Sequence, residues 1–311
     1  MRIYNNINEF DANCENLVVT TGMFDGVHIG HQTIIKRLKE IAAKQNGETV
    51  LLTFNPHPRL VLFPDDPSLE LLNTQNEKIK LLETAGIDHL IIHPFTKEFS
   101  RLSSIEFVRD ILVNKIKTKW LAIGYNHHFG RNREGSFEHL KEYGPVYGFN
   151  VEEISAQDID SVDVSSTKVR KALKEGKIVT ASKYLGYHYK LTGSVIKGKQ
   201  LGRKIGYPTA NILVSNKLKL VPSDGIYAVN VIHNSKRFQG MLSIGHNPTI
   251  EGKGRSIEVN IFNFNETIYE QDLTIEFVKK LRDEVKFESI EALKEQLAKD
   301  ELDSLEALNN S

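Results

Sequence analysis

The chain has 311 residues, and its 40 Lys and Arg residues balance 40 Asp and Glu residues, so the formal net charge at pH 7 is zero. This length favours two domains, each able to bury its own core. Zero net charge disfavours a nucleic-acid partner. The single cysteine, Cys14, excludes an internal disulfide and a cysteine-built metal site. With no secretory-type N-terminus and no membrane-length apolar run, we expect a cytoplasmic protein that has no membrane partner.

The first part of the chain alternates short apolar runs with segments of helical periodicity. The runs are Leu17–Thr21, Thr49–Phe54, His89–His93, Trp120–Gly124 and Val151–Ile154. This alternation predicts an α/β domain with a doubly wound parallel sheet, whose ligands bind outside the carboxyl ends of the strands. Ser103 and Glu106 have the spacing of a capping box and predict a helix start.

The pattern changes after Leu185 and Gly186. Short β-rich runs are then separated by Gly, Pro and Asn turns, and a helical pattern begins at Ser289; the runs are Tyr189–Ile196, Ile226–Ile232, Phe238–Ile244, Ser256–Phe262 and Leu273–Val278. This spacing predicts a small antiparallel β-barrel with a C-terminal helix. We therefore expect one domain at residues 1–186 and a second at 187–311.

A glycine-rich segment follows the first strong strand and opens directly into a helix. It contains Gly22, Phe24, Asp25, Gly26, His28, Gly30 and His31. The first N–H groups of a helix are unpaired and lie at the positive end of its dipole, which suits a polyphosphate. Two histidines beside them can donate hydrogen bonds to phosphate oxygens. Nucleotide chemistry is the prediction, and an ordinary glycine-rich turn is the alternative.

Three further segments are expected at the same edge of the sheet. His57 lies between two prolines that restrict the backbone, and the loop Gly124–Gly135 combines aromatic, amide and arginine side chains suited to a nucleotide. The segment Ser165–Arg170 begins a helix with hydroxyl and basic residues that suit a pyrophosphate. The alternatives are a rigid turn, a solvated loop and an ordinary helix cap, respectively.

A zinc site is a competing interpretation of the histidines in this half. The candidates are His28, His31, His57, His127 and His128. Helical zinc pairs usually stand four residues apart, and neither a cysteine nor an obvious carboxylate completes a tetrahedral set here. Phosphate binding is therefore the favoured interpretation.

The second half carries its own basic, glycine-rich segment at Gly193–Asn211. Positive charge among glycines suits a cover over a triphosphate, and the oxygens of Thr209 and Asn211 suit Mg²⁺. A β-hairpin with a basic loop is the alternative. Glu258 lies on an alternating strand, where it can be a solvent-facing residue or a base that accepts a hydroxyl proton. The pattern alone leaves both open.

In the same order along nearly the whole chain, these segments resemble the bacterial bifunctional riboflavin kinase/FAD synthetase family. The His-x-Gly-His motif at 28–31 is similar to that of nucleotidyltransferases. The kinase part is marked by Gly202-Arg203 followed by the specific run Gly206–Asn211. Residues 222–227, 244–249 and 282–287 add support. Asn55 and Asn126 differ from the family, where acidic residues are frequent.

The resemblance implies a role for each matching residue. His28 and His31 would be catalytic in adenylyl transfer, Glu258 would be the kinase base, and Thr209 and Asn211 would hold Mg²⁺. His57, Arg282 and Phe287 would contact the flavin. ATP and its phosphates would be bound by Gly22, Phe24, Asp25, Gly26, Gly30, Asn126, Ser165, Ser166, Thr167, Arg170, Gly198, Gly202, Arg203, Tyr207 and Pro208.

The implied function is ATP-dependent phosphorylation of riboflavin to FMN, followed by adenylylation of FMN to FAD with release of pyrophosphate. The expected ligands are riboflavin, FMN, ATP as substrate and Mg²⁺. One alternative is a riboflavin kinase whose first domain binds nucleotide without catalysis. Another is a non-catalytic flavin-binding regulator. The sequence leaves the oligomeric state open, a homo-oligomer included.

Overall fold

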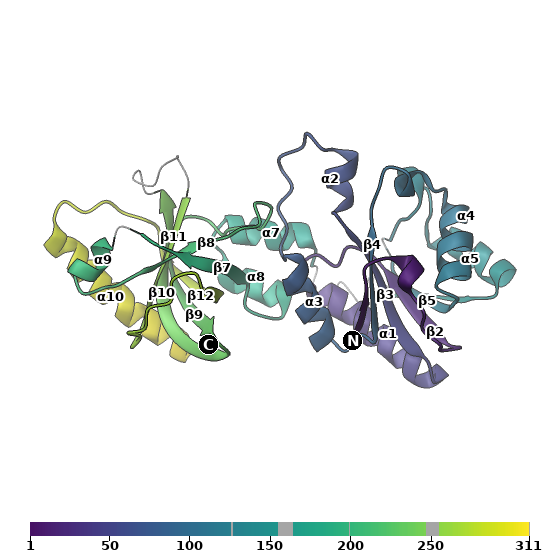
Figure 1. The fold of residues 1–311 in the computed structure, drawn as a ribbon, viewed down its shortest axis with the longest axis horizontal. Helices are drawn as coiled ribbons and strands as arrows, with labels where there is room; N and C mark the ends of the chain where they lie inside the picture. The colour runs from purple at the N-terminus through teal and green to yellow at the C-terminus, as the bar shows by residue number, and fades with distance from the viewer. Residues whose placement is uncertain (126, 155–163, 199, 247–254, 311) are drawn as a thin grey trace. The chain divides into compact units, whose positions relative to one another are not determined.

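A computed structural model describes residues 1–125, 127–154, 164–198, 200–246 and 255–310 (Figure 1). Backbone contacts divide the chain into a first unit, Met1–Ser165, and a second unit, Ser166–Ser311. The helices α7 (Ser166–Lys174) and α8 (Ile178–Leu185) thus pack with the second unit. The boundary after residue 186 remains a prediction.

The first unit is built on a parallel sheet of six strands in the order β1-β4-β3-β2-β5-β6. The strands are β1 (Arg2–Tyr4), β2 (Leu17–Thr21), β3 (Glu48–Asn55), β4 (His89–Pro94), β5 (Thr118–Gly124) and β6 (Asn150–Ile154). Five of them confirm the predicted runs. The edge strand β1 was missed because three residues carry too little pattern.

Helices cover both faces of this sheet, with α1 and α3 on one side and α4 and α5 on the other (Figure 1). Val18 belongs to one buried cluster and Val19 to another, because successive strand side chains point to opposite faces. The doubly wound α/β architecture is therefore confirmed. The helical segments are α1 (Ile29–Gln45), α2 (Pro58–Leu62), α3 (Gln75–Thr84), α4 (Ser104–Glu106), the π-helical η3 (Phe107–Lys115) and α5 (Phe137–Tyr147), with short 3-10 turns η1 (Ile7–Glu9), η2 (Phe99–Arg101) and η4 (Arg131–Arg133).

The predicted capping box is present at the start of α4. The Ser103 side chain accepts a hydrogen bond from the Glu106 backbone N–H, and the Glu106 carboxylate accepts one from the Ser103 N–H at 2.9 Å. Two otherwise unpaired helix donors are satisfied in this way. The helix therefore begins where the sequence indicated.

The second unit contains a closed barrel with the strand order β10-β11-β8-β7-β12-β9, every pairing being antiparallel. The strands are β7 (Lys190–Ile196), β8 (Ala210–Leu213), β9 (Gly225–His233), β10 (Lys236–His246), β11 (Arg255–Ile261) and β12 (Asp272–Arg282). The predicted barrel is confirmed. Sequence reasoning missed β8, although it considered a hairpin here, and β7 and β8 do form one.

The C-terminal helix α10 (Ile290–Asn309) packs against the barrel. Its Leu308 joins a buried cluster with Ala228, Met241, Phe262 and Val278, and the Tyr207 ring packs against this cluster. The short helix α9 (Leu201–Lys204) lies in the loop between β7 and β8. The predicted C-terminal helix is thus confirmed, and its apolar side closes part of the barrel surface.

Among the residues that the structure describes, no helix combines the length and the hydropathy needed to cross a membrane.

Candidate active sites

Strand pairing brings the candidate segments of the first unit to one edge of its sheet. Strand β2 lies between β3 and β5, and all three run parallel. The segments that follow these strands therefore start at the same edge of the sheet. They are Gly22–His31, Asn55–Pro58 and the loop from Gly124. This is the edge at which open α/β sheets bind ligands.

The two histidines stand at the N-terminus of α1. His28 is the N-cap residue, and its Nδ1 accepts a hydrogen bond from the His31 backbone N–H at 3.4 Å. The two rings stack with their centroids 3.7 Å apart, and the Phe24 ring lies 4.8 Å from that of His31. The structure thus places both side chains at the first turn of α1, at the positive end of the helix dipole.

Burial favours the uncharged form of His31. Burial, together with the neighbouring His28 and Lys78, lowers the pKa of His31 well below its ordinary value. Its buried Nδ1 has no hydrogen-bond partner among the described residues. An incoming phosphate oxygen would offer both a partner and a compensating negative charge, which would raise this pKa.

Asp25 supports the loop that precedes α1. It is 7% exposed, and its carboxylate accepts hydrogen bonds from the backbone N–H groups of Leu72 and Asn73 at 3.0 and 3.2 Å. The loop includes Phe24 with φ +49° and Val27 with φ +35°, which are uncommon values for residues with side chains. These hydrogen bonds make Asp25 a structural anchor of the loop, and its contact with ATP remains a prediction.

Lys78 of α3 is a buried cation that sequence reasoning missed. Its side chain is almost fully buried, and its Nζ donates hydrogen bonds to the Met23 carbonyl at 3.2 Å and to Thr53 Oγ1 at 3.4 Å. Burial lowers the pKa of Lys78 to about 8, although the negative charge of Asp25 opposes this shift. Only the folded structure reveals its burial, on the same face of α3 as Leu82.

The other predicted residues of this unit have mixed outcomes. His57 caps α2 by accepting a hydrogen bond from the Arg59 N–H at 3.2 Å, as a rigid turn would require. Asn126 lies outside the described residues. Phe129 is buried and packs on Phe107 with the ring centroids 5.7 Å apart, so this ring of the loop belongs to the core. Burial also lowers the pKa of His127 to about 4.

The segment Ser165–Arg170 spans the division between the two units. Ser165 ends the first unit, whereas Ser166, Thr167 and Arg170 lie in α7 of the second. Their predicted contact with pyrophosphate remains a prediction.

In the barrel, strand register brings three polar residues together. Strand β11 lies between β8 and β10, which places Glu258 opposite Asn211 on one side and opposite Ser243 on the other. Thr209 Oγ1 donates a hydrogen bond to Glu258 Oε2 at 3.0 Å. Residues about 50 positions apart in sequence thus share one site.

Close backbone approach explains two of the predicted glycines. A Cβ atom on Gly198 would lie 2.2 Å from Asn211 Nδ2, and one on Gly202 would lie 2.2 Å from the Tyr207 carbonyl oxygen. Asn260 Nδ2 donates to the Pro208 carbonyl at 2.7 Å. The segment before Thr209 is therefore fixed tightly against β8 and β11.

A cavity of about 680 Å³ opens beside Glu258. Its lining includes six of the predicted residues: Gly202, Tyr207, Thr209, Glu258, Arg282 and Phe287. The lining does not include the predicted residues Gly198, Arg203, Pro208 and Asn211. The volume is within the usual range for a site that takes a small molecule.

Arg282 is held by the C-terminal helix. Its Nε and Nη2 donate to the two carboxylate oxygens of Asp300 at 2.8 and 2.6 Å, and Asp300 is 1% exposed. Gln296 Nε2 also donates to Asp300, at 2.8 Å. The guanidinium carbon lies 5.8 Å from the centre of the Phe287 ring. Sequence reasoning missed Asp300, which fixes the predicted flavin-binding arginine.

Within the described ranges, no group of three or more His, Cys, Asp and Glu side chains is arranged to hold a metal ion. A zinc site at the five histidines therefore gains no support from the described residues.

Comparisons with known proteins match both units. A family model described as FAD synthetase matches residues 10–168, and one described as riboflavin kinase matches residues 185–308. The bifunctional riboflavin kinase/FMN adenylyltransferase of Buchnera aphidicola subsp. Schizaphis graminum is 39% identical, with 96% of each chain covered. That of Escherichia coli K12 is 35% identical, with 94% of this chain and 93% of the relative covered.

A crystal structure described as a macrolide-efflux protein from Streptococcus pneumoniae has the same fold. It is 30% identical with a TM-score of 0.88, and the match covers 96% of this chain and 97% of that one. The two matching family models together define a transferase that uses nucleotides. The chain belongs to the bifunctional riboflavin kinase/FMN adenylyltransferase family.

The position of Lys78 generates a prediction about stability and pH. Its pKa is about 8 in the folded protein and about 10.4 when exposed, so the unfolded chain binds more protons between these values. The wild type should therefore gain about 1 kcal/mol of unfolding free energy per pH unit from pH 8 to 10, relative to Lys78→Met. Denaturant unfolding at several pH values measures this difference. Parallel pH profiles for the two proteins would contradict a buried, proton-releasing Lys78.

The Arg282–Asp300 pair generates a second prediction. Removing one charge from a buried ion pair leaves the other poorly placed, so Asp300→Asn should raise the riboflavin KM about tenfold and change the ATP KM less than about twofold. Steady-state kinase assays measure both constants. Glu295→Gln, an exposed carboxylate on the same helix, is the matched control. Lower stability with an unchanged riboflavin KM would show that the pair serves folding alone.

Proposed function

We propose that this chain makes flavin cofactors in two ATP-dependent reactions. In the second unit, the 5′-hydroxyl oxygen of riboflavin forms a bond to the γ-phosphorus of ATP, which releases ADP and yields FMN. In the first unit, a phosphate oxygen of FMN forms a bond to the α-phosphorus of another ATP, which releases pyrophosphate and yields FAD. The family membership supports both steps.

The observation that carries the kinase step is the environment of Glu258. This carboxylate accepts a hydrogen bond from a hydroxyl, that of Thr209, at the wall of a cavity large enough for a small ligand. A substrate hydroxyl at the same carboxylate can donate its hydrogen in the same way. As the oxygen–phosphorus bond forms, the proton passes to Glu258.

The side chains beside Glu258 also fit Mg²⁺. Thr209 and Asn211 offer a hydroxyl oxygen and a carboxamide oxygen, both hard ligands, and the missing side chain of Gly198 makes room for the Asn211 carboxamide. We propose that these two residues and the ATP phosphates hold the ion, which would neutralise developing charge on the phosphates. Arg282 and Phe287 would bind the flavin, and Gly202, Arg203, Tyr207 and Pro208 would shape the ATP side.

The adenylyl-transfer step needs no protein nucleophile, because the FMN phosphate is itself ionised near neutral pH. The N–H groups that begin α1, with His28 and His31, would stabilise negative charge on the ATP phosphates. The loop before α1 would be shaped by Gly22, Phe24, Asp25, Gly26 and Gly30. The phosphate contacts would be completed by Asn126, Ser165, Ser166, Thr167 and Arg170. His57 would lie near the flavin.

The single cysteine fits a cytoplasmic location, which remains part of the proposal.

Two substitutions should separate the two reactions. Glu258→Ala should abolish conversion of riboflavin to FMN while FAD synthesis from supplied FMN continues. His31→Ala should leave the kinase reaction intact and slow FAD synthesis by about 10²-fold, the usual scale for loss of one charge-stabilising donor. Chromatography of flavins after incubation with ATP and Mg²⁺ measures both.

The reaction that each variant retains reports that the unit without the substitution is intact. Loss of both reactions in either variant would contradict two separate sites. Wild-type protein that stops at FMN would support the kinase-only alternative, and unchanged riboflavin would support the regulator.

A further inference from the structure

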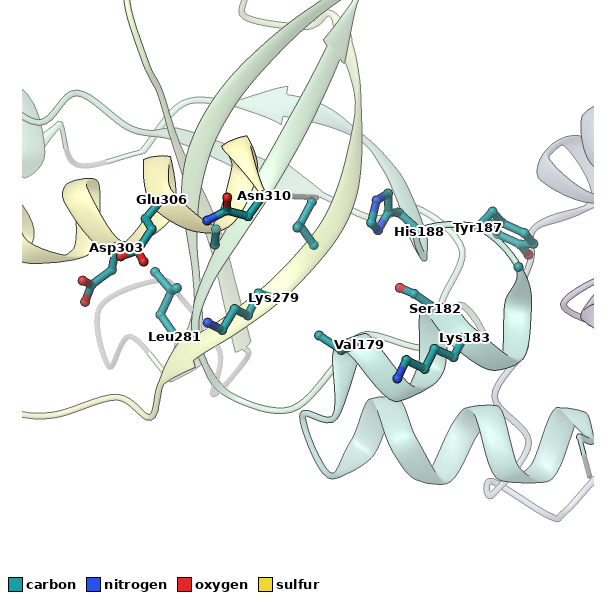
Figure 2. A pocket seen from close by; sticks show the side chains of 13 residues that line it. Val179, Ser182, Lys183, Tyr187, His188, Lys279, Leu281, Asp303, Glu306 and Asn310 are labelled. Carbon is teal, nitrogen blue, oxygen red and sulfur yellow. The ribbon is translucent and has the colours of Figure 1, made fainter. Parts of the chain in front are cut away.

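The second unit contains another cavity, of about 980 Å³, formed by α8 with the segment after it, β12 and the end of α10 (Figure 2). It shares no lining residue with the cavity beside Glu258. Helix α10 contributes to the lining of both cavities. The Glu258 cavity is lined by Ile290, Leu293, Leu297 and Asp300, and the second cavity is lined by Asp303, Glu306, Ala307 and the capping residue Asn310. The kinase reaction proposed above leaves this second cavity without a use.

The α8 side of the second cavity offers hydrogen-bonding atoms without partners. Ser182 Oγ and His188 Nδ1 are buried, and neither has a hydrogen-bond partner in the described part of the chain. Figure 2 shows them on the same side as Lys183. A buried polar atom without a partner costs about 1–3 kcal/mol, so a ligand that pairs with it gains that energy. A hydroxyl, an imidazole and an ammonium group together suit a phosphate.

Lys279 of β12 adds a second ammonium group to the lining. No ion pair joins Lys183 or Lys279 to any residue within the described ranges. An ammonium group without an ion-pair partner attracts an anion. Figure 2 shows Lys183 on the side of Ser182 and His188, and Lys279 nearer to Leu281.

The α10 side has the opposite character. Asp303, Glu306 and Asn310 follow one another at intervals of three or four residues and so lie on one face of the helix. They lie at its C-terminal end, where the helix dipole is negative, and neither carboxylate forms an ion pair with a described residue. This side therefore suits hydrogen-bond donors such as hydroxyl or amino groups. Apolar contacts are available between the two sides from Val179, Val278, Leu281 and Ala307.

We propose that the second cavity binds a nucleotide. The phosphate would lie against Ser182, Lys183 and His188, the hydroxyl or amino groups would donate to Asp303 and Glu306, and the ring would pack on the apolar side chains between them. A phosphate at one end and donors at the other are the features of this class of molecule. FMN and adenine nucleotides share them, and the experiment distinguishes these two sources.

Equilibrium dialysis of the full chain against FMN and, separately, against AMP counts the molecules bound per chain. The wild type should bind one more molecule of FMN or of AMP than the double variant Lys183→Glu/Lys279→Glu, and the probe that shows the difference identifies the source. Kinase activity should be the same in both proteins, because neither lysine lines the Glu258 cavity. Lys236→Glu, an exposed lysine that lines neither cavity, should bind as the wild type does.

Ser182→Ala keeps the test independent of charge reversal and of folding. It removes a buried hydroxyl that has no described partner, so the variant should fold normally and bind the extra nucleotide about fivefold more weakly. Equal numbers of bound FMN and of bound AMP in the wild type and the double variant would overturn the proposal. An equal loss in Lys236→Glu would also overturn it, since general charge would then explain the binding.

Discussion

Hydrogen-bonded strand pairing is the constraint on which both candidate sites depend. In the first unit, β2 pairs in parallel with β3 and β5, so three segments far apart in sequence begin at one edge of the sheet. In the barrel, β11 pairs with β8 and β10, which places Glu258 opposite Asn211 and Ser243. A shift of one residue in the register of β11 would turn Glu258 to the other face of the barrel. The chemistry of each site is therefore inseparable from its register.

Both sites also contain buried charges that favour position over stability. Lys78 lies almost fully buried beneath the loop before α1, and Asp300 is buried against Arg282. Removing a charge from water costs several kcal/mol, and a partner recovers that energy only when the geometry is good. Buried charges of this kind contribute little net stability. Lys78 holds the loop before α1 in one arrangement, and Asp300 does the same for Arg282. Reactions that depend on positioning benefit from this rigidity.

Local patterns in the sequence predicted most of the fold. The alternation of apolar runs identified five of six strands in the sheet, and the Gly22–His31 motif identified the N-terminus of α1, although the role of His28 as its cap was not predicted. These features depend on neighbours within a few residues. The two missed strands, β1 and β8, have three and four residues, which is too few for a period to emerge.

Residues whose role depends on distant partners were not predictable in this way. Lys78 reads as one more surface lysine until α3 packs beneath the Met23 carbonyl, and Asp300 reads as part of a solvated helix until it meets Arg282. Phe129 is a related case, since the polar loop that contains it does not indicate that its ring belongs to the core. Tertiary packing decides each of these cases, and no local pattern encodes it.

The central claim is that one chain carries two separate sites, each of which binds its own ATP. Calorimetric titration of the full chain with a non-hydrolysable ATP analogue and Mg²⁺ measures this directly. In the Lys183→Glu/Lys279→Glu chain, which lacks the cations of the second cavity, we expect two analogue molecules per chain, one lost on substitution of His31 and the other on substitution of Thr209. A single molecule per chain, lost on either substitution, would contradict the account.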